Sequence, residues 1–200
     1  QNAEVIGLDT ETSGLHFKKE KLWSVQVSDG NTAALYPFNG EPKNFPFLRQ
    51  LLLSDAIKVA HNATFDWKFL KQNGYCVNNI YCSQVAEQTL EAGRVQRGFF
   101  GLKDTIERYF NIKLDKTTRR DFYAVYSKNP TEKNPLGVLN ENYFGITKEW
   151  TPELIRYACD DVFYLPELYR MQMRKAQVTN LEKTLWLEMK LIPETAMMEY

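Results

Sequence analysis

The chain has 200 residues, 44% of them hydrophobic and 25% charged, a balance typical of a soluble globular protein and not of a disordered or fibrous one. The charges of the 25 basic and 25 acidic residues cancel. The chain therefore lacks the strong positive charge that is typical of proteins that bind nucleic acid without specificity. No apolar run reaches the roughly 18–20 residues of a membrane span, and the N-terminus does not resemble a signal peptide. We therefore expect no membrane partner. Three cysteines without metal-ligand spacing indicate free thiols.

The first part of the chain predicts strands. Residues 5–8 form a short apolar run, which predicts a buried strand that ends at Asp9. Residues 22–27 alternate and are rich in aromatic and β-branched side chains, so they predict a second strand. Turn residues at 29–31 precede a third strand at 32–36. Together the three predict an antiparallel meander.

The pattern then changes to helices and one more strand, at residues 57–60. Helical spacing predicts helices over residues 44–53, 64–72, 83–92, 102–110, 151–164, 166–176 and 181–198. Asn73-Gly74 is a stop signal, and Thr151-Pro152 is a start signal. Pro166 is expected to kink the chain or open a new helix, and Pro193 to interrupt the last helix. Strands followed by α/β alternation predict a mixed sheet flanked by helices.

Two acidic residues end the first predicted strand, in the segment Asp9-Thr10-Glu11. A period-two spacing puts both carboxylates on one face of the strand, where they repel unless a positive charge lies between them. A divalent cation supplies that charge best, and carboxylate oxygens suit Mg²⁺ or Mn²⁺. The alternative is a strand end with two solvated acids.

A second pattern follows the strand at 57–60 and reads His61-Asn62-Ala63-Thr64-Phe65-Asp66. Asn62 is placed to cap the next helix, and Asp66 lies in the first turn of that helix. A helix cap with an acid favoured by the helix dipole is the alternative to a metal ligand here. We interpret His61 as a core or cap-adjacent residue and not as a metal ligand.

A third pattern lies on the predicted helix over 151–164 and reads Tyr157-Ala158-Cys159-Asp160-Asp161. Tyr157 and Asp161 are spaced i and i+4, so both project from one helix face. Asp160 is a rival at i+3, but Asp161 has the better register. A half-buried tyrosine beside an exposed acid is the alternative interpretation. Each pattern alone is weak, whereas the three in this order are a much stronger signal.

The three patterns resemble the motifs of the DEDD exonuclease superfamily, in the subclass with Tyr in its third motif. The flanking segments 101–110 and 150–154 are similar to the proofreading domain of family A DNA polymerases, the DNA polymerase I family. Residues 187–193 with 198–199 resemble the passage into a polymerase region. The resemblance thus implies an exonuclease domain over residues 1–178 and a helical segment over 179–200. Cys82-Ser83 stands where relatives often carry Asp-Thr, a departure that affects local packing.

The resemblance implies an RNase H-like fold, an α/β mixed five-stranded sheet flanked by helices, and a two-metal 3'-5' exonuclease. Two divalent ions, Mg²⁺ or Mn²⁺, would be held by the four acids of the motifs. Tyr157 would orient the attacking water, because a phenol with a reference pKa near 10 is a poor general base. Contacts with nucleic acid are implied for Thr10, Leu15, Asn62 and Phe65. The acids that the resemblance makes catalytic and metal-binding are Asp9, Glu11, Asp66 and Asp161.

We expect the substrate to be a single-stranded DNA 3' end and the chain to be a cytoplasmic monomer, with a polymerase domain possible in the same natural chain. An RNA-processing exonuclease of the ribonuclease D or Werner type and a catalytically silent nucleic-acid-binding module remain the alternatives. Phe144 is a further stacking candidate, and residues 127–149 predict a long loop. The densest basic cluster is Lys116, Arg119 and Arg120, which predicts either phosphate contacts or a solvated face.

Overall fold

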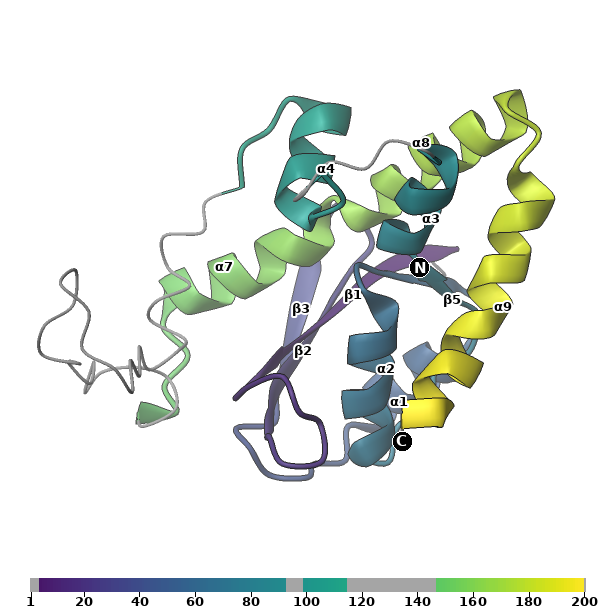
Figure 1. Ribbon diagram of the computed structural model, residues 1–200. Coiled ribbons are helices and arrows are strands. Elements are labelled where there is room, and N and C mark those ends of the chain that lie inside the picture. The colour runs from purple at the N-terminus through teal and green to yellow at the C-terminus, as the bar shows by residue number, and fades with distance from the viewer. Residues whose placement is uncertain (1–3, 93–98, 115–146, 200) are drawn as a thin grey trace, which may run out of the picture.

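The computed structural model describes residues 4–92, 99–114 and 147–199. Within these ranges, five strands form one sheet in the order β3-β2-β1-β4-β5 (Figure 1). The first three strands pair antiparallel, and β4 and β5 run parallel to β1. This is the RNase H-like mixed sheet that the resemblance implies, with β1 at its centre. The strands are β1 (Val5–Thr12), β2 (Leu22–Ser28), β3 (Ala33–Pro37), β4 (Ile57–Ala60) and β5 (Ile80–Cys82).

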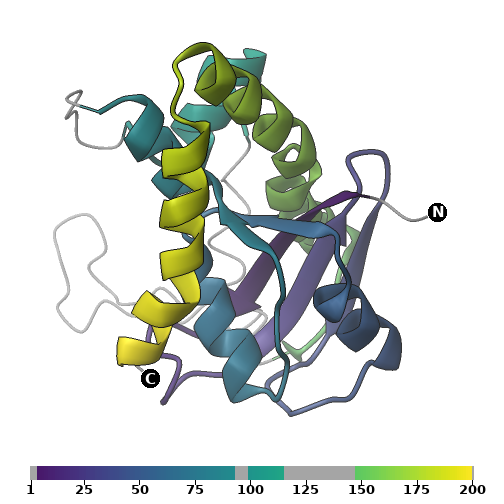
Figure 2. The same ribbon diagram turned by 90° about the vertical axis from the view of Figure 1, so that its right-hand side faces the viewer.

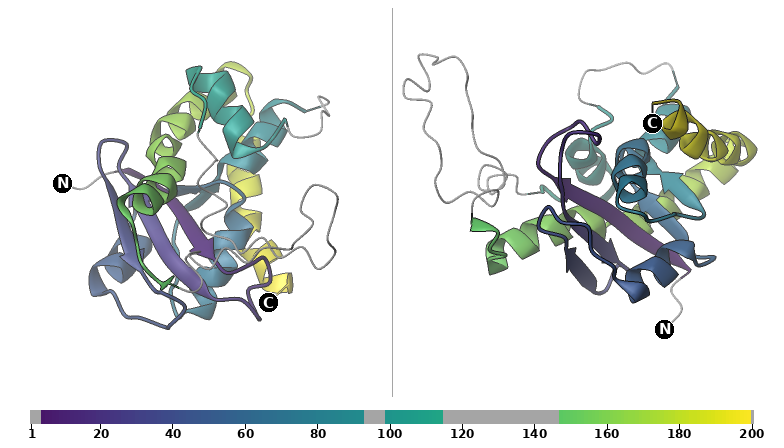
Figure 3. Two further views of the ribbon diagram at one scale, coloured as in Figure 1. Left: turned by 90° about the vertical axis from the view of Figure 1, so that its left-hand side faces the viewer. Right: turned by 90° about the horizontal axis from the view of Figure 1, so that it is seen from below.

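Helices flank both faces of the sheet. Helix α7 crosses β1, β2 and β3 (Figure 3, left), and α8 continues from it towards β4. Helix α2 packs on the opposite side of β1, and α9 runs alongside α2 and covers β5 (Figure 2). The described helices are α1 (Pro46–Leu53), α2 (Ala63–Gln72), α3 (Ser83–Leu90), α4 (Leu102–Phe110), α7 (Pro152–Phe163), α8 (Leu165–Val178) and α9 (Glu182–Glu199).

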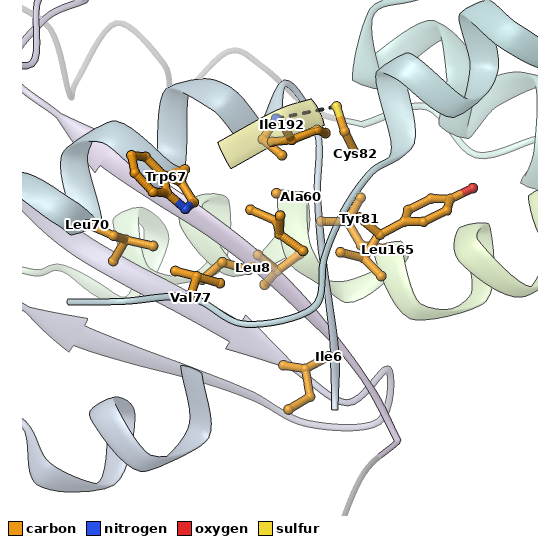
Figure 4. Packing of buried hydrophobic residues seen from close by; sticks show 14 of the residues in the cluster. Ile6, Leu8, Ala60, Trp67, Leu70, Val77, Tyr81, Cys82, Leu165 and Ile192 are labelled. Carbon is orange, nitrogen blue, oxygen red and sulfur yellow. Dashed lines mark hydrogen bonds between the residues drawn. The ribbon is translucent and has the colours of Figure 1, made fainter. Parts of the chain in front are cut away.

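The main core lies between the sheet and the helices. Leu8 of β1 belongs to the same buried cluster as Trp67 and Leu70 of α2 and Ile192 of α9 (Figure 4). The buried thiol of Cys82 accepts a hydrogen bond from the first N–H of α2, at 3.4 Å, which fixes β5 to the start of that helix. The ends of β1, β4 and β5 are therefore held at fixed positions relative to α2.

Several predicted boundaries are confirmed. The Thr151 side chain accepts a hydrogen bond from the Leu154 N–H at 3.3 Å, and Pro152 opens α7. Gly74 adopts a φ of +78° just after α2, which a residue without Cβ tolerates best. Pro166 opens α8 instead of bending α7.

The three cysteines are free thiols. No helix in the described ranges has the length and apolar character needed to cross a membrane.

Three features of the fold differ from the sequence predictions. The first strand does not end at Asp9 but continues to Thr12, because this segment goes on pairing with β2. Strand β5 was not predicted, because three residues are too few to show a pattern, yet Ile80, Tyr81 and Cys82 are all buried beside β4. The expected interruption at Pro193 is wrong, since α9 continues to Glu199. Ile192 and Ala196 are buried on either side of the proline. This packing offsets the backbone hydrogen bond that a proline removes.

Candidate active site

The central strand carries the first two acids. Alternation along β1 puts Gly7, Asp9 and Glu11 on the sheet face that α7 covers, and Thr10 on the face towards α2. Glu11 is buried, with 5% of its surface exposed, whereas Asp9 is half-buried. Strand β2 pairs with β1 along Gly7–Thr12, the stretch that carries both acids, and β4 pairs with the first residues, Val5–Gly7. The two carboxylates therefore project from a rigid part of the molecule.

Asp66 reaches the same strand from α2. This helix begins directly after β4, which ends beside the middle of β1. The Thr10 hydroxyl donates a hydrogen bond to Asp66 Oδ1 at 2.7 Å, so Asp66 contacts the residue between Asp9 and Glu11. Only 1% of Asp66 is exposed, and this burial raises its pKa to about 7 although the Thr10 hydrogen bond acts in the opposite direction.

Helix α7 brings the third motif against β1. A Cβ atom added to Gly7 would lie 2.3 Å from the carbonyl oxygen of Val162 and 3.2 Å from Leu165 Cβ. The backbones of α7 and β1 thus approach as closely as a glycine allows. Asp161 precedes Val162, and Gly7 lies two residues before Asp9. The glycine therefore determines how near the acid of α7 can come to the acids of β1.

We expect Gly7→Ala to push α7 away from β1, because the added methyl group meets backbone that cannot turn aside. The free energy of unfolding should fall by roughly 1–3 kcal/mol, and cleavage should slow because Tyr157 and Asp161 move with α7. Thermal denaturation and a nuclease assay measure the two effects. Ala196→Val, which adds volume in the buried packing of α9, is the control and should lower stability without slowing cleavage by the folded fraction. Unchanged stability of the Gly7 variant would contradict the close contact.

A β-bulge shapes the sheet beside Tyr157. Glu11 pairs with Ser24 and Thr12 pairs with Leu22, which leaves Trp23 as an extra residue on β2. Such a bulge redirects a side chain and bends the strand. Trp23 packs in a small buried cluster with Tyr157 and with Leu154 and Ala158 of α7. Tyr157, 7% exposed, is thereby held at the flank of α7 next to the sheet.

Leu15 lies on a compact loop that follows β1. The Ser13 N–H donates to the Lys21 carbonyl at 2.9 Å, and the Lys21 N–H donates to Ser13 Oγ at 2.8 Å, so the loop is closed at its base. Phe17 is buried beneath the loop, whereas Leu15 is 78% exposed. A leucine that is exposed in this way does not belong to the core and is available to a ligand.

The residues around Asp66 differ in part from expectation. The predicted side-chain cap by Asn62 is wrong: Asn62 precedes α2 but has φ 64° and ψ 47°, and its side chain makes no cap hydrogen bond. This left-handed backbone leaves its side chain exposed beside the helix start. Phe65 is half-buried against Phe69, with ring centroids 4.9 Å apart. Both nitrogens of His61 contact protein groups, Ser83 Oγ and the Phe100 carbonyl, each at 2.9 Å, as befits a structural residue.

The basic groups near the site are ones that the sequence analysis did not select. Lys18 Nζ and Lys68 Nζ lie 5.6 Å and 5.5 Å from the centroid of the Phe17 ring, so loop and helix each bring a cation to one place. Spacing in the sequence could not pair two lysines 50 residues apart. Three sequence predictions lie outside the described residues. They are the basic cluster of Lys116, Arg119 and Arg120, the stacking candidate Phe144, and residues 127–146 of the predicted loop.

The chemistry of the four acids fits divalent cations. Carboxylate oxygens are the hard ligands that Mg²⁺ and Mn²⁺ prefer. Asp66 in particular is a buried acid, and burial raises its pKa because it disfavours the charged carboxylate. In the described ranges, no three Asp, Glu, His or Cys side chains are already gathered into a metal-binding group. The acids are not gathered because like charges repel one another and because the Thr10 hydroxyl holds the Asp66 carboxylate.

A sheet in this order, with two acids in the second half of its central strand and further acids on two helices beside it, has the arrangement of an RNase H-like fold. Residues 1–176 match the family model of the DNA polymerase A exonuclease domain, described as 3'-5' exonuclease. The chain belongs to this 3'-5' exonuclease family.

Similar proteins include a polymerase and several nucleases. The DNA polymerase DpoZ of Vibrio phage phiVC8 is 22% identical in an alignment over 206 residues that covers 95% of this chain and 31% of DpoZ. The chain thus spans about a third of that relative. Brucella melitensis NrnC with bound Mg²⁺ superposes with a TM-score of 0.79 at 20% identity, over 99% of this chain and 86% of that one. Escherichia coli RNase D gives 0.73 at 20%, over 96% and 45%. These structural likenesses establish the fold.

Proposed function

We propose that this chain removes nucleotides from the 3' end of single-stranded DNA with two divalent cations, as the proofreading domain of a DNA polymerase. The observation that carries the proposal is the arrangement around β1. Asp66 contacts the residue between Asp9 and Glu11, and the Gly7 contact brings the helix of Asp161 against the same strand. Membership of the 3'-5' exonuclease family supports the reaction and its direction.

The four acids would hold two cations, Mg²⁺ or Mn²⁺. Asp9 would serve both cations, Glu11 and Asp161 would help hold the first, and Asp66 would help hold the second. Such ions activate water and stabilise charge on the phosphate during hydrolysis. The Tyr157 hydroxyl would hydrogen-bond the attacking water and orient it. The buried cluster with Trp23 restricts the movement of this tyrosine, which makes it suited to positioning.

The exposed residues near these acids would hold the terminal nucleotide. Leu15, on its closed loop, would wedge against the last bases. Asn62 would help shape the site, and the half-buried Phe65 would offer a stacking surface. Thr10 would act through Asp66, because its hydroxyl is already donated to that carboxylate. Lys18 and Lys68 supply positive charge next to the loop, which suits a phosphate backbone.

Two observations support a polymerase-linked role on DNA. The first is the relative DpoZ, a DNA polymerase about three times the length of the region it shares with this chain. The second is the outer side of α9, where Leu187, Leu191 and Met198 are 63%, 54% and 89% exposed. Apolar side chains in such a row are typical of a surface that another domain covers. We propose that residues 179–200 lead towards a polymerase region and that the exonuclease unit is a monomer in the cytoplasm.

An RNA-processing exonuclease is the second candidate, favoured by the structural likeness to RNase D, an exoribonuclease involved in structured RNA processing. A catalytically silent binding module is the third.

One assay separates the three. DNA and RNA strands of one sequence, labelled at the 5' end, and the same DNA as a duplex are incubated with the chain and Mg²⁺. We expect stepwise shortening of labelled single-stranded DNA, slower shortening of the duplex, and none in excess EDTA. Faster shortening of RNA would favour the second candidate, no shortening of any strand the third, and full activity in EDTA would exclude the metal scheme.

A further inference from the structure

A fully buried polar side chain lies next to the proposed site and has no role in the scheme above. Gln26 lies in the middle of β2 between two valines and is 0% exposed. Its amide Nε2 donates a hydrogen bond to Ser24 Oγ. Among the buried side-chain oxygens and nitrogens of the described residues, Gln26 Oε1 is the one without a hydrogen-bond partner. An unpaired buried carbonyl is unfavourable, so its presence calls for an explanation.

The strand register places this amide beside the proposed metal ligands. Gln26 pairs directly with Asp9, and Ser24 pairs directly with Glu11. Residues paired in this way on antiparallel strands project to the same face, with Cβ atoms roughly 4.5–5.5 Å apart. Gln26 and Ser24 therefore form a second polar row on the sheet face that α7 covers, parallel to the row of Asp9 and Glu11. A glutamine amide on the next strand is within reach of the Asp9 carboxylate.

The two ends of the amide have nearly the same size and opposite hydrogen-bonding character. Turning the amide over exchanges them without changing the packing. Ser24 would then donate its hydroxyl proton to Gln26 Oε1, which satisfies the unpaired carbonyl. The Gln26 Nε2 group would point away from Ser24 and become a donor to a carboxylate. In this orientation every polar atom of the pair has a chemically matched partner.

We propose that Gln26 is a positioning residue for Asp9: its amide, oriented by Ser24, donates to one oxygen of the Asp9 carboxylate and leaves the other oxygen for the cations. This inference rests on the proposed function, in which Asp9 would help hold both cations. Hydrogen bonds to a metal-binding carboxylate fix its orientation, and loss of such a partner typically lowers metal affinity or activity about 10- to 100-fold.

The test is Gln26→Met, which keeps the length and shape of the side chain and removes the amide. A glutamine with only a structural role and an unpaired carbonyl would be replaced by methionine at no cost in melting temperature and with no change in metal dependence. For a positioning residue we expect the melting temperature without metal to stay the same or rise. The Mn²⁺ concentration that gives half-maximal binding, measured by titration calorimetry without substrate, should increase about 10- to 100-fold.

The matched control is Gln172→Met, at the other fully buried glutamine of the described residues. Gln172 on α8 donates to the Ser83 carbonyl and to Glu87 Oε2, each at 3.0 Å, and accepts from the Tyr81 hydroxyl at 3.2 Å. The oxygen and the nitrogen of its amide both have hydrogen-bond partners, and none of these partners is Asp9. We expect this variant to lose melting temperature and to keep the Mn²⁺ midpoint, the reverse of the result at Gln26.

The possible outcomes separate the two levels of the argument. A Gln26→Met protein that binds Mn²⁺ like the unchanged chain would overturn the role of Gln26 while leaving the proposed function intact. A chain that binds no divalent ion, or an Asp9→Ala variant with full activity, would overturn the proposed function itself. If Gln26→Met does not fold, Ser24→Ala decides the question, because loss of the hydroxyl that orients the amide must raise the Mn²⁺ midpoint of a folded protein; an unchanged midpoint rejects the inference.

Discussion

Replacement of Asp9 by alanine is expected to abolish cleavage while leaving the fold intact. Asp9 would help hold both cations, so its loss should lower the rate by about 1,000-fold or more. The variant should melt at or above the temperature of the unchanged chain, since it removes one of two neighbouring like charges on β1. A 5'-labelled DNA strand measures the rate, and circular dichroism measures the melting temperature.

Two controls sharpen this experiment. Asp104→Ala removes an exposed acid in the first turn of α4, away from β1, and should leave cleavage unchanged. Asp161→Ala and Asp160→Ala compare the adjacent acids on α7, and we expect the larger loss from Asp161. Cleavage at the normal rate by the Asp9 variant would reject the metal scheme, and a larger loss from Asp160 would change the assignment of the third motif.

Asp66→Asn should have opposite effects on stability and on activity. Burial raises the pKa of Asp66 from 3.8 to about 7, so the folded protein holds a proton that the unfolded chain releases at lower pH. Stability of the metal-free protein must therefore fall as the pH rises from about 4 to about 7, and stay low above it. Asparagine carries no charge and still accepts from the Thr10 hydroxyl. We expect a gain of up to about 4 kcal/mol at pH 8 and little gain at pH 4.

Denaturant unfolding in EDTA at pH 4 and pH 8 tests the pH dependence, and the nuclease assay tests function. The asparagine variant should lose most cleavage activity, because it lacks a ligand of the second cation. Addition of Mg²⁺ at pH 8 should stabilise the unchanged chain and have less effect on the variant. If both proteins had the same free energy of unfolding at pH 8 in EDTA, the charged form of Asp66 would not destabilise the folded protein, and the prediction would be wrong.

Much of the architecture follows from local sequence patterns. The antiparallel meander, the start of α7 at Thr151 and the end of α2 at Gly74 each depend on a few adjacent residues, whose preferences act locally. The chemistry of the three motifs could also be assigned from side-chain type and spacing. Strand β5 and the unbroken α9 could not, because neighbouring elements stabilise them against weak or contrary local preferences.

The local conformation of Asn62 shows the same limit within the site. An asparagine before a helix predicts a side-chain cap, but the link between β4 and α2 imposes a left-handed backbone there, and the cap does not form. Trp23 is another case, since only the pairing of β1 with β2 shows that it is the extra residue of a bulge.

Side-chain types and their spacing along the chain indicate which acids are available, on which elements they lie, and the family of reactions that they suit. How closely those elements approach depends on the way they pack. Gly7 resembles any small residue in an apolar run until the α7 backbone lies against it, and Gln26 resembles an ordinary strand residue until its cross-strand partner is known to be Asp9. The reason is physical: distances between segments remote in the chain depend on packing and strand register, which no single segment encodes.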